Sequence, residues 1–283
     1  MPPAARKLRG PQIYNAHDIA ALSGAAFLAR SVLDHVISAV APGVRPIDLE
    51  RHCREGLSRE GAVALMEAIA NNDGEPFGFA CSVSVDDAVA HQRPTHDALK
   101  PGQLVTIDLM LAIDGWHADV ADSVVVGGGG HPLLTALDAV WAAGLAAIGP
   151  GVAWSEVASA MNSAADANGV RLVRGLAGHG IGLAPHELPV LPLIPDEPDP
   201  PLILRPGLVF TLEPAITSGS GQTADSEDGW AILTADGAPA VGREAMIAVE
   251  SDGFRLLGGP VLDDSPGVAG YNPLRTGPSS GLR

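Results

Sequence analysis

The stretch Thr106–Val126, TIDLMLAIDGWHADVADSVVV, predicts a β-hairpin with two aspartates on one face. Asp114-Gly115 is a preferred two-residue type I′ turn sequence, and β-prone apolar runs flank it on both sides. With these residues in the loop, Met110 pairs with Asp119, and Asp108 points the same way as Met110 because side chains alternate along a strand. The two aspartates are then diagonal neighbours, about 7–8 Å apart at Cβ.

Two carboxylates this close on strands that look buried repel each other and lose solvation. One of them must be protonated, or a cation must lie between them, and a divalent metal ion meets this need. On the hairpin alone, the alternative is that Asp108 and Asp119 are polar positions on a solvated sheet face. Asp114 belongs to the turn, and Asp122 is expected to point to the opposite face.

The composition indicates a soluble protein with an aliphatic core. The 283 residues are 46% hydrophobic and 4% aromatic, which allows one large domain or two small ones. The formal net charge of −16 argues against nucleic acid or an anionic membrane as a partner. Cys53 and Cys81 lack a CxxC spacing, so neither a disulfide framework nor a structural zinc site is expected.

No signal peptide or membrane span is predicted. No apolar segment directly follows the basic N-terminus, and residues 18–40 carry ionisable side chains such as Arg30 and Asp34. We therefore expect a cytoplasmic protein, and a monomer.

Two similar helix pairs predict an internal duplication. Helices are expected over four ranges: 17–41, 48–60, 133–148 and 155–168. The first helix of each pair ends at Pro-Gly-Val, and Pro42 and Pro150 of these two motifs are 108 residues apart. We predict two α+β halves that share one sheet layer; the alternative is chance recurrence of a short helix-ending motif.

The domain organisation follows from composition shifts at the two ends of the chain. A flexible arm is expected over 1–13, a single domain over 14–258, and a Gly/Pro/Ser-rich tail over 259–283. Within the domain, the proline-rich acidic segment 192–206 is expected to be a loop.

Further motifs carry side chains suited to metal binding. His179 lies within Gly178–Gly182 (GHGIG), where alternating glycines let the imidazole approach a ligand closely. Glu213 interrupts an apolar strand predicted over 209–216, and Glu244 lies in a similar strand over 243–249. An unpaired buried glutamate would cost several kcal/mol, although each could instead lie at a solvated strand end.

Together these candidates supply four carboxylates and one imidazole: Asp108, Asp119, His179, Glu213 and Glu244. Two divalent cations with a bridging water or hydroxide would balance this charge. Oxygen-rich ligation with one nitrogen suits Mn, Fe(II), Co or Zn better than copper. Two ions about 3.5–4 Å apart lower the pKa of a bridging water and polarise a carbonyl, which predicts hydrolytic chemistry.

The ordered motifs resemble the type I methionine aminopeptidases of the pita-bread metallopeptidase family. The resemblance runs from about residue 13 to 258, through IDLMLAIDGWHAD, GHGIGLAPHELP, FTLEP and a late strand glutamate. It implies an α+β pita-bread fold, with two duplicated halves around a curved antiparallel sheet. It also implies a dinuclear-metal enzyme that excises N-terminal methionine from peptides or nascent proteins.

The resemblance also implies individual roles. Asp108 would bind one metal ion in bidentate fashion, His179 and Glu213 would bind the other, and Asp119 and Glu244 would bridge both.

Two histidines outside the ligand set, His91 and His186, would contact the substrate and stabilise the tetrahedral intermediate, and Glu213 would shuttle a proton. The residue pattern alone would not have selected His91. Three other histidines are not expected to bind metal: His117, His96 and His131, the last two as surface residues.

The predicted substrate pocket departs from the family pattern. Ala245 and Met246 follow the bridging glutamate where histidine and threonine are usual, and Pro185 replaces an aromatic residue. Trp230 matches a pocket residue of the family. The usual tyrosine-bearing stretch is replaced by GEPFGFACS, whose candidate substitutes are Phe77, Phe79, Cys81 and Ser82. Hydrolysis is therefore better supported than methionine specificity.

Three alternatives stay open. An X-Pro dipeptidase or aminopeptidase would usually carry a further N-terminal domain and a different histidine-glycine spacing. A paralogue specialised for one peptide is compatible with the altered pocket. A non-catalytic pita-bread binding protein would typically lose metal ligands, whereas all five are present here.

Overall fold

The structure is a computed structural model that describes residues 10–71, 74–194 and 202–258. Its helices are α1 (Ala16–Ser38), α2 (Pro46–Arg59), the short 3-10 helix η1 (Met66–Ala68), α3 (Pro132–Ala147) and α4 (Trp154–Ala167). The four predicted helices are confirmed, each within three residues of its expected ends. The predicted tail, residues 1–9 of the arm and part of the predicted proline-rich loop lie outside the described residues.

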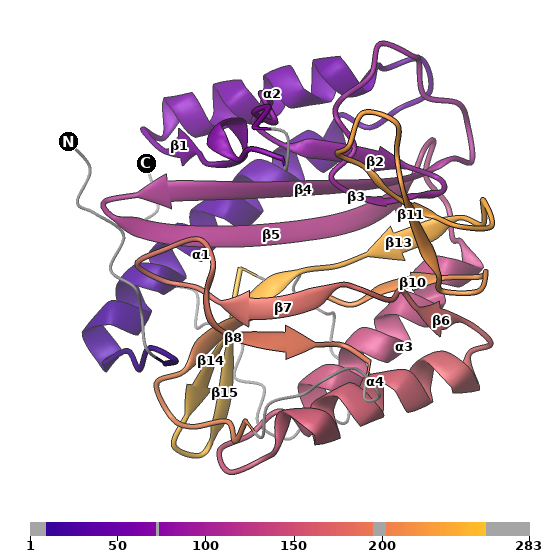
Figure 1. Cartoon of the computed structure of the whole chain (residues 1–283). Coiled ribbons are helices and arrows are strands. Elements are labelled where there is room, and N and C mark those ends of the chain that lie inside the picture. Colours follow the sequence, from indigo (N-terminus) through magenta and orange to yellow (C-terminus); the bar gives the residue numbers. More distant parts are fainter. Residues whose placement is uncertain (1–9, 72–73, 195–201, 259–283) are drawn as a thin grey trace, which may run out of the picture.

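The described strands pair antiparallel and form four sheets (Figure 1). The first contains β1 (Val63–Ala64), β2 (Ser82–Val85), β4 (Leu104–Ile113) and β5 (Trp116–Val125). The largest has the order β15 (Gly253–Leu257), β14 (Ala245–Glu250), β9 (Val209–Leu212), β7 (Ala177–Gly180), β8 (Glu187–Pro192). Two small sheets contain β13 (Ala240–Gly242), β10 (Ala215–Thr217) and β6 (Arg171–Leu172), and β11 (Thr223–Asp225), β12 (Ile232–Thr234) and β3 (Ala88–Ala90).

The β4–β5 hairpin has the predicted register. Asp114 and Gly115 form its turn with φ angles of 51° and 82°, the left-handed values that a type I′ turn requires. Met110 pairs with Asp119 across the two strands. Asp108 therefore lies on the same face as Asp119, as alternation along the strands predicted.

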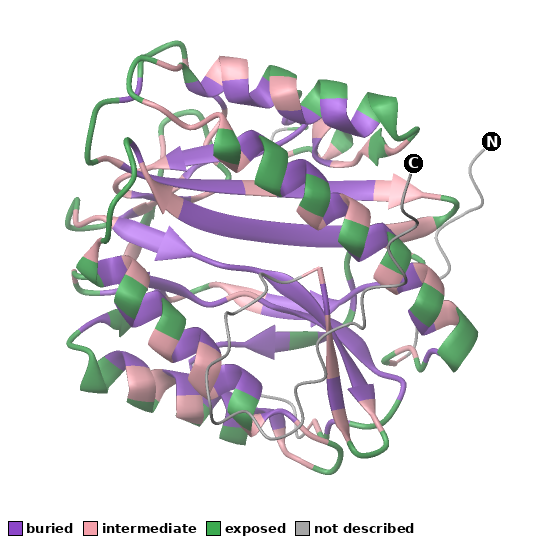
Figure 2. Ribbon diagram, turned by 180° about the vertical axis from the view of Figure 1, so that it is seen from behind, coloured by how far each residue is buried: buried purple, intermediate pink, exposed green. Residues whose placement is uncertain are grey.

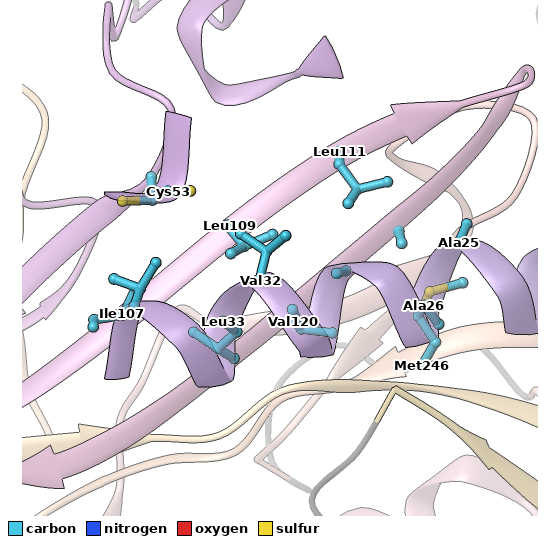
Figure 3. Packing of buried hydrophobic residues seen from close by; sticks show 14 of the residues in the cluster. Ala25, Ala26, Val32, Leu33, Cys53, Ile107, Leu109, Leu111, Val120 and Met246 are labelled. Atoms are coloured by element: carbon cyan, nitrogen blue, oxygen red, sulfur yellow. The ribbon is translucent and has the colours of Figure 1, made fainter. Parts of the chain in front are cut away.

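Helix α1 covers the outer face of this hairpin (Figure 2). Figure 3 shows Val32 of α1 beside Leu109 of the hairpin, and Leu33 of α1 with Leu111 and Val120 of the hairpin belongs to the same cluster. Each such buried aliphatic side chain contributes about 1.5–3 kcal/mol to folding. By length and composition α1 could cross a membrane, but in the structure its apolar face forms the core of the first half.

A second core lies beneath α3 and α4, which pack against each other and against the sheet of β13, β10 and β6, and this core includes residues of the largest sheet. Trp141 and Trp154 are fully buried in this core, with Phe210 and Leu212 of β9 in the same cluster. The two helix pairs thus cover separate parts of the sheets (Figure 1).

One expected strand is broken: the prediction of a single strand over 209–216 was wrong, whereas the strand expected over 243–249 is present as β14 and begins two residues later. Residues 209–216 form β9 and β10, which belong to different sheets, and β13 and β14 likewise separate at residues 243–244. Pro214 lacks the N–H that a continuous ladder would use, and the backbone N–H of Arg243 donates to its carbonyl at 3.2 Å. The segments at residues 213–214 and 243–244 therefore pass from one sheet to another side by side, and the predicted single sheet layer is divided.

Candidate metal centre

The five predicted ligands come together, although they are up to 136 positions apart in the sequence (Asp108 to Glu244). Ligand atoms lie within 4.8 Å of one another in three groups: Asp108 with Asp119 and Glu244, His179 with Glu213 and Glu244, and Asp119 with His179 and His186. Asp119, His179 and Glu244 each belong to two groups. The three groups therefore overlap in one cluster of acids and imidazoles.

The β4–β5 hairpin contributes two carboxylates from its inner face, the face opposite α1. Asp108 pairs with Ala121 in the ladder, and Asp119 is almost fully buried. Loss of hydration raises the pKa of Asp108 to about 7. Burial also raises the pKa of Asp119, and the charges of Asp108 and Glu213 raise it further.

The second half contributes Glu213 and Glu244 from the two places where strands change sheet. Thr211 donates a hydrogen bond to Glu213 Oε1 at 2.5 Å. The backbone of Glu244 pairs with Ala121 of β5, with its N–H donating to the Ala121 carbonyl at 2.8 Å. Desolvation raises the pKa of Glu213 to about 8, and burial followed by the charge of Asp119 raises the pKa of Glu244.

His179 is placed by its flanking glycines. A Cβ atom at Gly178 would lie 2.3 Å from the Thr211 carbonyl oxygen, and one at Gly180 would lie 2.3 Å from that of Leu188. His179 Nδ1 lies 3.0 Å from the Gly180 carbonyl oxygen, so this nitrogen carries the proton and Nε2 is left as the electron-pair donor. Desolvation lowers the pKa of His179 to about 4, which keeps the ring neutral at pH 7.

Nε2 of His179 faces the acidic cluster, 3.7 Å from Asp119 Oδ2 and 3.7 Å from Glu213 Oε1. Asp119 Oδ1 and Glu244 Oε1 are buried and accept no hydrogen bond from the described residues. Buried carboxylate oxygens need a compensating donor or cation. Several carboxylates with imidazole nitrogen form a donor set that divalent first-row metals accept, so the residues present fit a metal centre.

His91 and His186 lie on the cavity wall beside the cluster. The ring centroids of His186 and His179 are 4.3 Å apart. His91 follows β3 and has a φ of 56°, a left-handed conformation that is uncommon outside glycine and often marks functional positions. Desolvation lowers the pKa of both His91 and His186, which favours their neutral forms.

The cavity has a volume of about 800 Å³ and an apolar end. Phe77 and Trp230, both predicted, line that end with their ring centroids 5.0 Å apart. Met66 and Met110 complete the same cluster and were not predicted. The alternation that placed Asp108 also signalled Met110, whereas nothing in the sequence signalled Met66. The other proposed substitutes differ in place: Ser82 lines the cavity, Phe79 packs against Phe77, and Cys81 is fully buried.

The remaining predicted histidines lie away from the ligand cluster. His117 places Nδ1 3.0 Å from the carbonyl oxygen of Gly182 and ties the hairpin to the glycine-rich segment. His96 is exposed, as expected. His131, expected at the surface, is half-buried and caps α3 by accepting the Leu133 N–H at 3.2 Å.

Glu187 is a buried acid whose role the sequence did not reveal. Its carboxylate accepts the Tyr14 hydroxyl at 2.8 Å and the backbone N–H groups of Leu183 and Ala184 at 2.8 and 2.9 Å. These bonds fix the short loop that presents His186. Only the tertiary fold brings Tyr14 to this loop, so no local pattern could indicate the contact.

The sequence profile of metallopeptidase family M24 matches residues 20–251. This chain belongs to metallopeptidase family M24. A methionine aminopeptidase of Treponema pallidum is 32% identical over 232 residues, which cover 81% of this M24 chain and 89% of the relative. Methionine aminopeptidase 1 of Mycobacterium tuberculosis is 33% identical over 273 residues, with 91% and 99% of the two chains covered.

Solved structures agree with the M24 assignment. The methionine aminopeptidase of Rickettsia prowazekii has a TM-score of 0.81 and 27% identity, and the match covers 88% of this chain and 99% of that one. An Xaa-Pro dipeptidase of Bacillus anthracis shares the fold with a TM-score of 0.67 at 21% identity, and the match covers 61% of it. The predicted α+β pita-bread fold is confirmed.

Proposed function

We propose that this M24 metallopeptidase is an aminopeptidase that uses two divalent cations to release N-terminal methionine from peptides or nascent proteins. The observation that carries the proposal is the convergence of four carboxylates and His179 beside an apolar cavity end. Mn, Fe(II), Co and Zn all suit this donor set.

The ligands divide as the family resemblance implies. Asp108 would hold one ion, His179 and Glu213 the other, and Asp119 and Glu244 both. When bound, the ions would lower the pKa of a water molecule and polarise the carbonyl of the first peptide bond.

The side chains around the cluster would orient and protonate the substrate. His91 and His186 would donate hydrogen bonds to the carbonyl oxygen as negative charge develops on it. Glu213, oriented by the hydroxyl of Thr211, would carry a proton towards the leaving amine. Phe77 and Trp230 would receive the side chain of the first residue, together with Met66 and Met110.

A peptide panel tests this proposal. The metal-free protein is loaded anaerobically with Mn, Fe(II), Co or Zn and assayed on Met-Ala-Ser, Leu-Ala-Ser and Ala-Pro. We expect cleavage of Met-Ala-Ser that exceeds cleavage of the other two, and loss of this activity in Glu213→Gln. Preferential cleavage of Ala-Pro would favour an X-Pro enzyme, and no cleavage with any metal would contradict the proposal.

A paralogue specialised for one peptide is the second candidate, favoured by one observation. Pro185 stands where the family has an aromatic pocket residue. Turnover of a longer peptide without turnover of any short methionine peptide would select this alternative.

We also propose that the enzyme is a cytoplasmic monomer whose catalytic domain spans residues 14–258. Its partner would be the N-terminus of a peptide or nascent chain. The net charge of −16 disfavours nucleic acid and anionic membranes as partners. Light scattering on the purified protein should give the mass of one chain.

A further inference from the structure

Three large apolar side chains are exposed close together in the sequence beside the cavity. Leu183, Leu188 and Val190 expose 61%, 41% and 52% of their surface; we call them the β8 rim. Elsewhere in the described ranges, four other large apolar side chains are this exposed: Ile13, Phe27, Val63 and Ile203. Contiguous exposed apolar surface at a cleft commonly marks a binding region.

The rim is continuous with the site. Leu188 and Val190 alternate along β8 with the buried Glu187, Pro189 and Leu191, so their side chains share one face of the strand. Both also line the cavity that contains the metal-ligand cluster. Leu183 belongs to the loop, fixed by Glu187, that presents His186.

The position of β8 determines which part of a substrate would reach the rim. Within the described strands β8 pairs with β7 alone and forms an edge of the largest sheet. Figure 1 shows β8 below β7, on the side of the hairpin opposite β1 and β2. The apolar cavity end contains Met66 and Phe77, which lie near β1 and β2 in the sequence. The ligand cluster joins the hairpin that pairs with these strands to His179 of β7, the strand that pairs with β8. A peptide with its first side chain at that end and its first peptide bond at the cluster would extend towards β8.

The chemistry of the rim favours side-chain recognition over strand pairing. Pro189 and Pro192 remove two backbone donors from the six residues of β8, which weakens the strand as an edge for another β-strand. Leu188 and Val190 are two residues apart, the spacing at which side chains of an extended peptide point the same way. The occupant that fits is a polypeptide with apolar side chains at alternate positions.

We propose that the β8 rim binds apolar side chains of the substrate downstream of the cleaved bond. The enzyme would thereby select polypeptides with such residues among positions 3 to 5. This inference rests on the proposed aminopeptidase function, because the direction of the substrate follows from it.

Matched peptides and matched variants test the rim. The substrates are Met-Ala followed by four serines and the same peptide with leucine at position 3, 4 or 5, or at both 3 and 5. The variants are Val190→Thr, Leu188→Asn and, as a control of the same exposed type far along the chain on β1, Val63→Thr. For each protein we compare kcat/KM on the leucine peptides with kcat/KM on the serine peptide, so that overall activity cancels.

We expect the wild-type ratio to reach about fivefold to tenfold for the best leucine peptide, as partial burial of one leucine allows. Val190→Thr and Leu188→Asn should bring the ratio towards one, and Val63→Thr should leave it at the wild-type value. A ratio near one in the wild type, or one that falls equally in Val63→Thr, would overturn the proposal while leaving the aminopeptidase function intact.

Binding of the same peptides to the metal-free protein, which does not turn them over, gives an independent readout. Calorimetry should show tighter binding of the leucine peptides, and this difference should shrink when Val190→Thr is added. Equal affinities would overturn the rim proposal even if no peptide were cleaved. Self-association that Val190→Thr abolishes would overturn it as well, because the rim would then be a contact between copies of this chain.

Discussion

Asp119 and Asp122 lie three residues apart on β5 and both are buried, yet their surroundings are opposite. Asp122 faces the helices and accepts hydrogen bonds from Arg30 at 2.9 Å and Arg243 at 3.0 Å. Asp119 faces the cavity, and its Oδ1 has no partner among the described residues. One strand therefore carries a carboxylate compensated within the fold and another whose charge the described residues leave uncompensated.

The ion pairs of Asp122 also connect β5 to helices α1 and α3. Arg243 donates to Asp138 of α3 at 2.7 Å as well as to Asp122. Its neighbour Glu244 pairs through its backbone with Ala121. The ion pairs on the outer face thus hold together the backbone that carries repelling acids on the inner face.

Asp119→Asn should have the largest effect on activity. Because we propose that Asp119 contacts both ions, we expect kcat to fall well beyond the ~10–100-fold typical of changes to residues behind the ligands. The metal-free protein should not lose stability, because asparagine replaces a buried acid whose ionised form is disfavoured by burial and by its acidic neighbours. Turnover of Met-Ala-Ser and the thermal midpoint in EDTA measure the two effects, and an active Asp119→Asn would refute this role.

Asp122→Asn should show the opposite pattern. It leaves Arg30 and Arg243 without their shared buried carboxylate, and breaking such a pair costs about 3–5 kcal/mol of unfolding free energy. Asp138→Asn is the control, since this carboxylate is 57% exposed and its ion pair should contribute about 1 kcal/mol or less. Urea denaturation in EDTA measures the free energy of unfolding of the two variants. Equal losses would show that the buried ion pairs of Asp122 stabilise the fold no more than the exposed pair of Asp138.

The metal-free protein should become less stable as pH rises. The folded-state pKa values of Asp108, about 7, and Glu213, about 8, lie above their ordinary values of 3.8 and 4.5. Between the ordinary and the raised pKa values, the folded chain therefore binds more protons than the unfolded chain. Their favourable contribution is complete below about pH 4 and is lost as pH passes through 7 to 8. Thermal midpoints in EDTA between pH 5 and 8.5 should therefore fall more steeply than those of Asp119→Asn or of the Mn-loaded protein. Thermal midpoints of the metal-free protein that stay constant or rise over this pH range would contradict the burial of Asp108 and Glu213 as protonated groups.

Ser123→Ala should have a smaller effect than either aspartate substitution on β5. The Ser123 hydroxyl donates to the Gly242 carbonyl at 2.7 Å and accepts the Gly242 N–H at 2.9 Å, so it connects β5 to β13 without charge. Its loss should cost about 1–3 kcal/mol and leave the metal affinity within a few-fold of wild type. A larger fall in affinity than in Asp122→Asn would assign the linking role to this neutral contact instead.

Features set by local rules could be predicted from the sequence. The Asp-Gly turn and strand alternation determined the hairpin register and placed Asp108 and Asp119 on one face. His91 had no such signal, because its left-handed backbone and its place on the cavity wall arise only in the folded chain. Glu213 and Glu244 were expected inside strands, but they lie where strands change sheet. The ion pairs of Arg243 depend on residues more than one hundred positions away, beyond the reach of any local pattern.

We infer that the inner face of β5 supplies charge for metal ions, while the outer face is complete without them. Anaerobic calorimetric titration of the metal-free protein with Mn(II), checked by elemental analysis, distinguishes the two faces. We predict two equivalents bound per wild-type chain, loss of at least one equivalent in Asp119→Asn, and retention of both in folded Asp122→Asn. Fewer than one equivalent in the wild type, or binding unchanged by Asp119→Asn, would show that the inner face of β5 does not hold the ions.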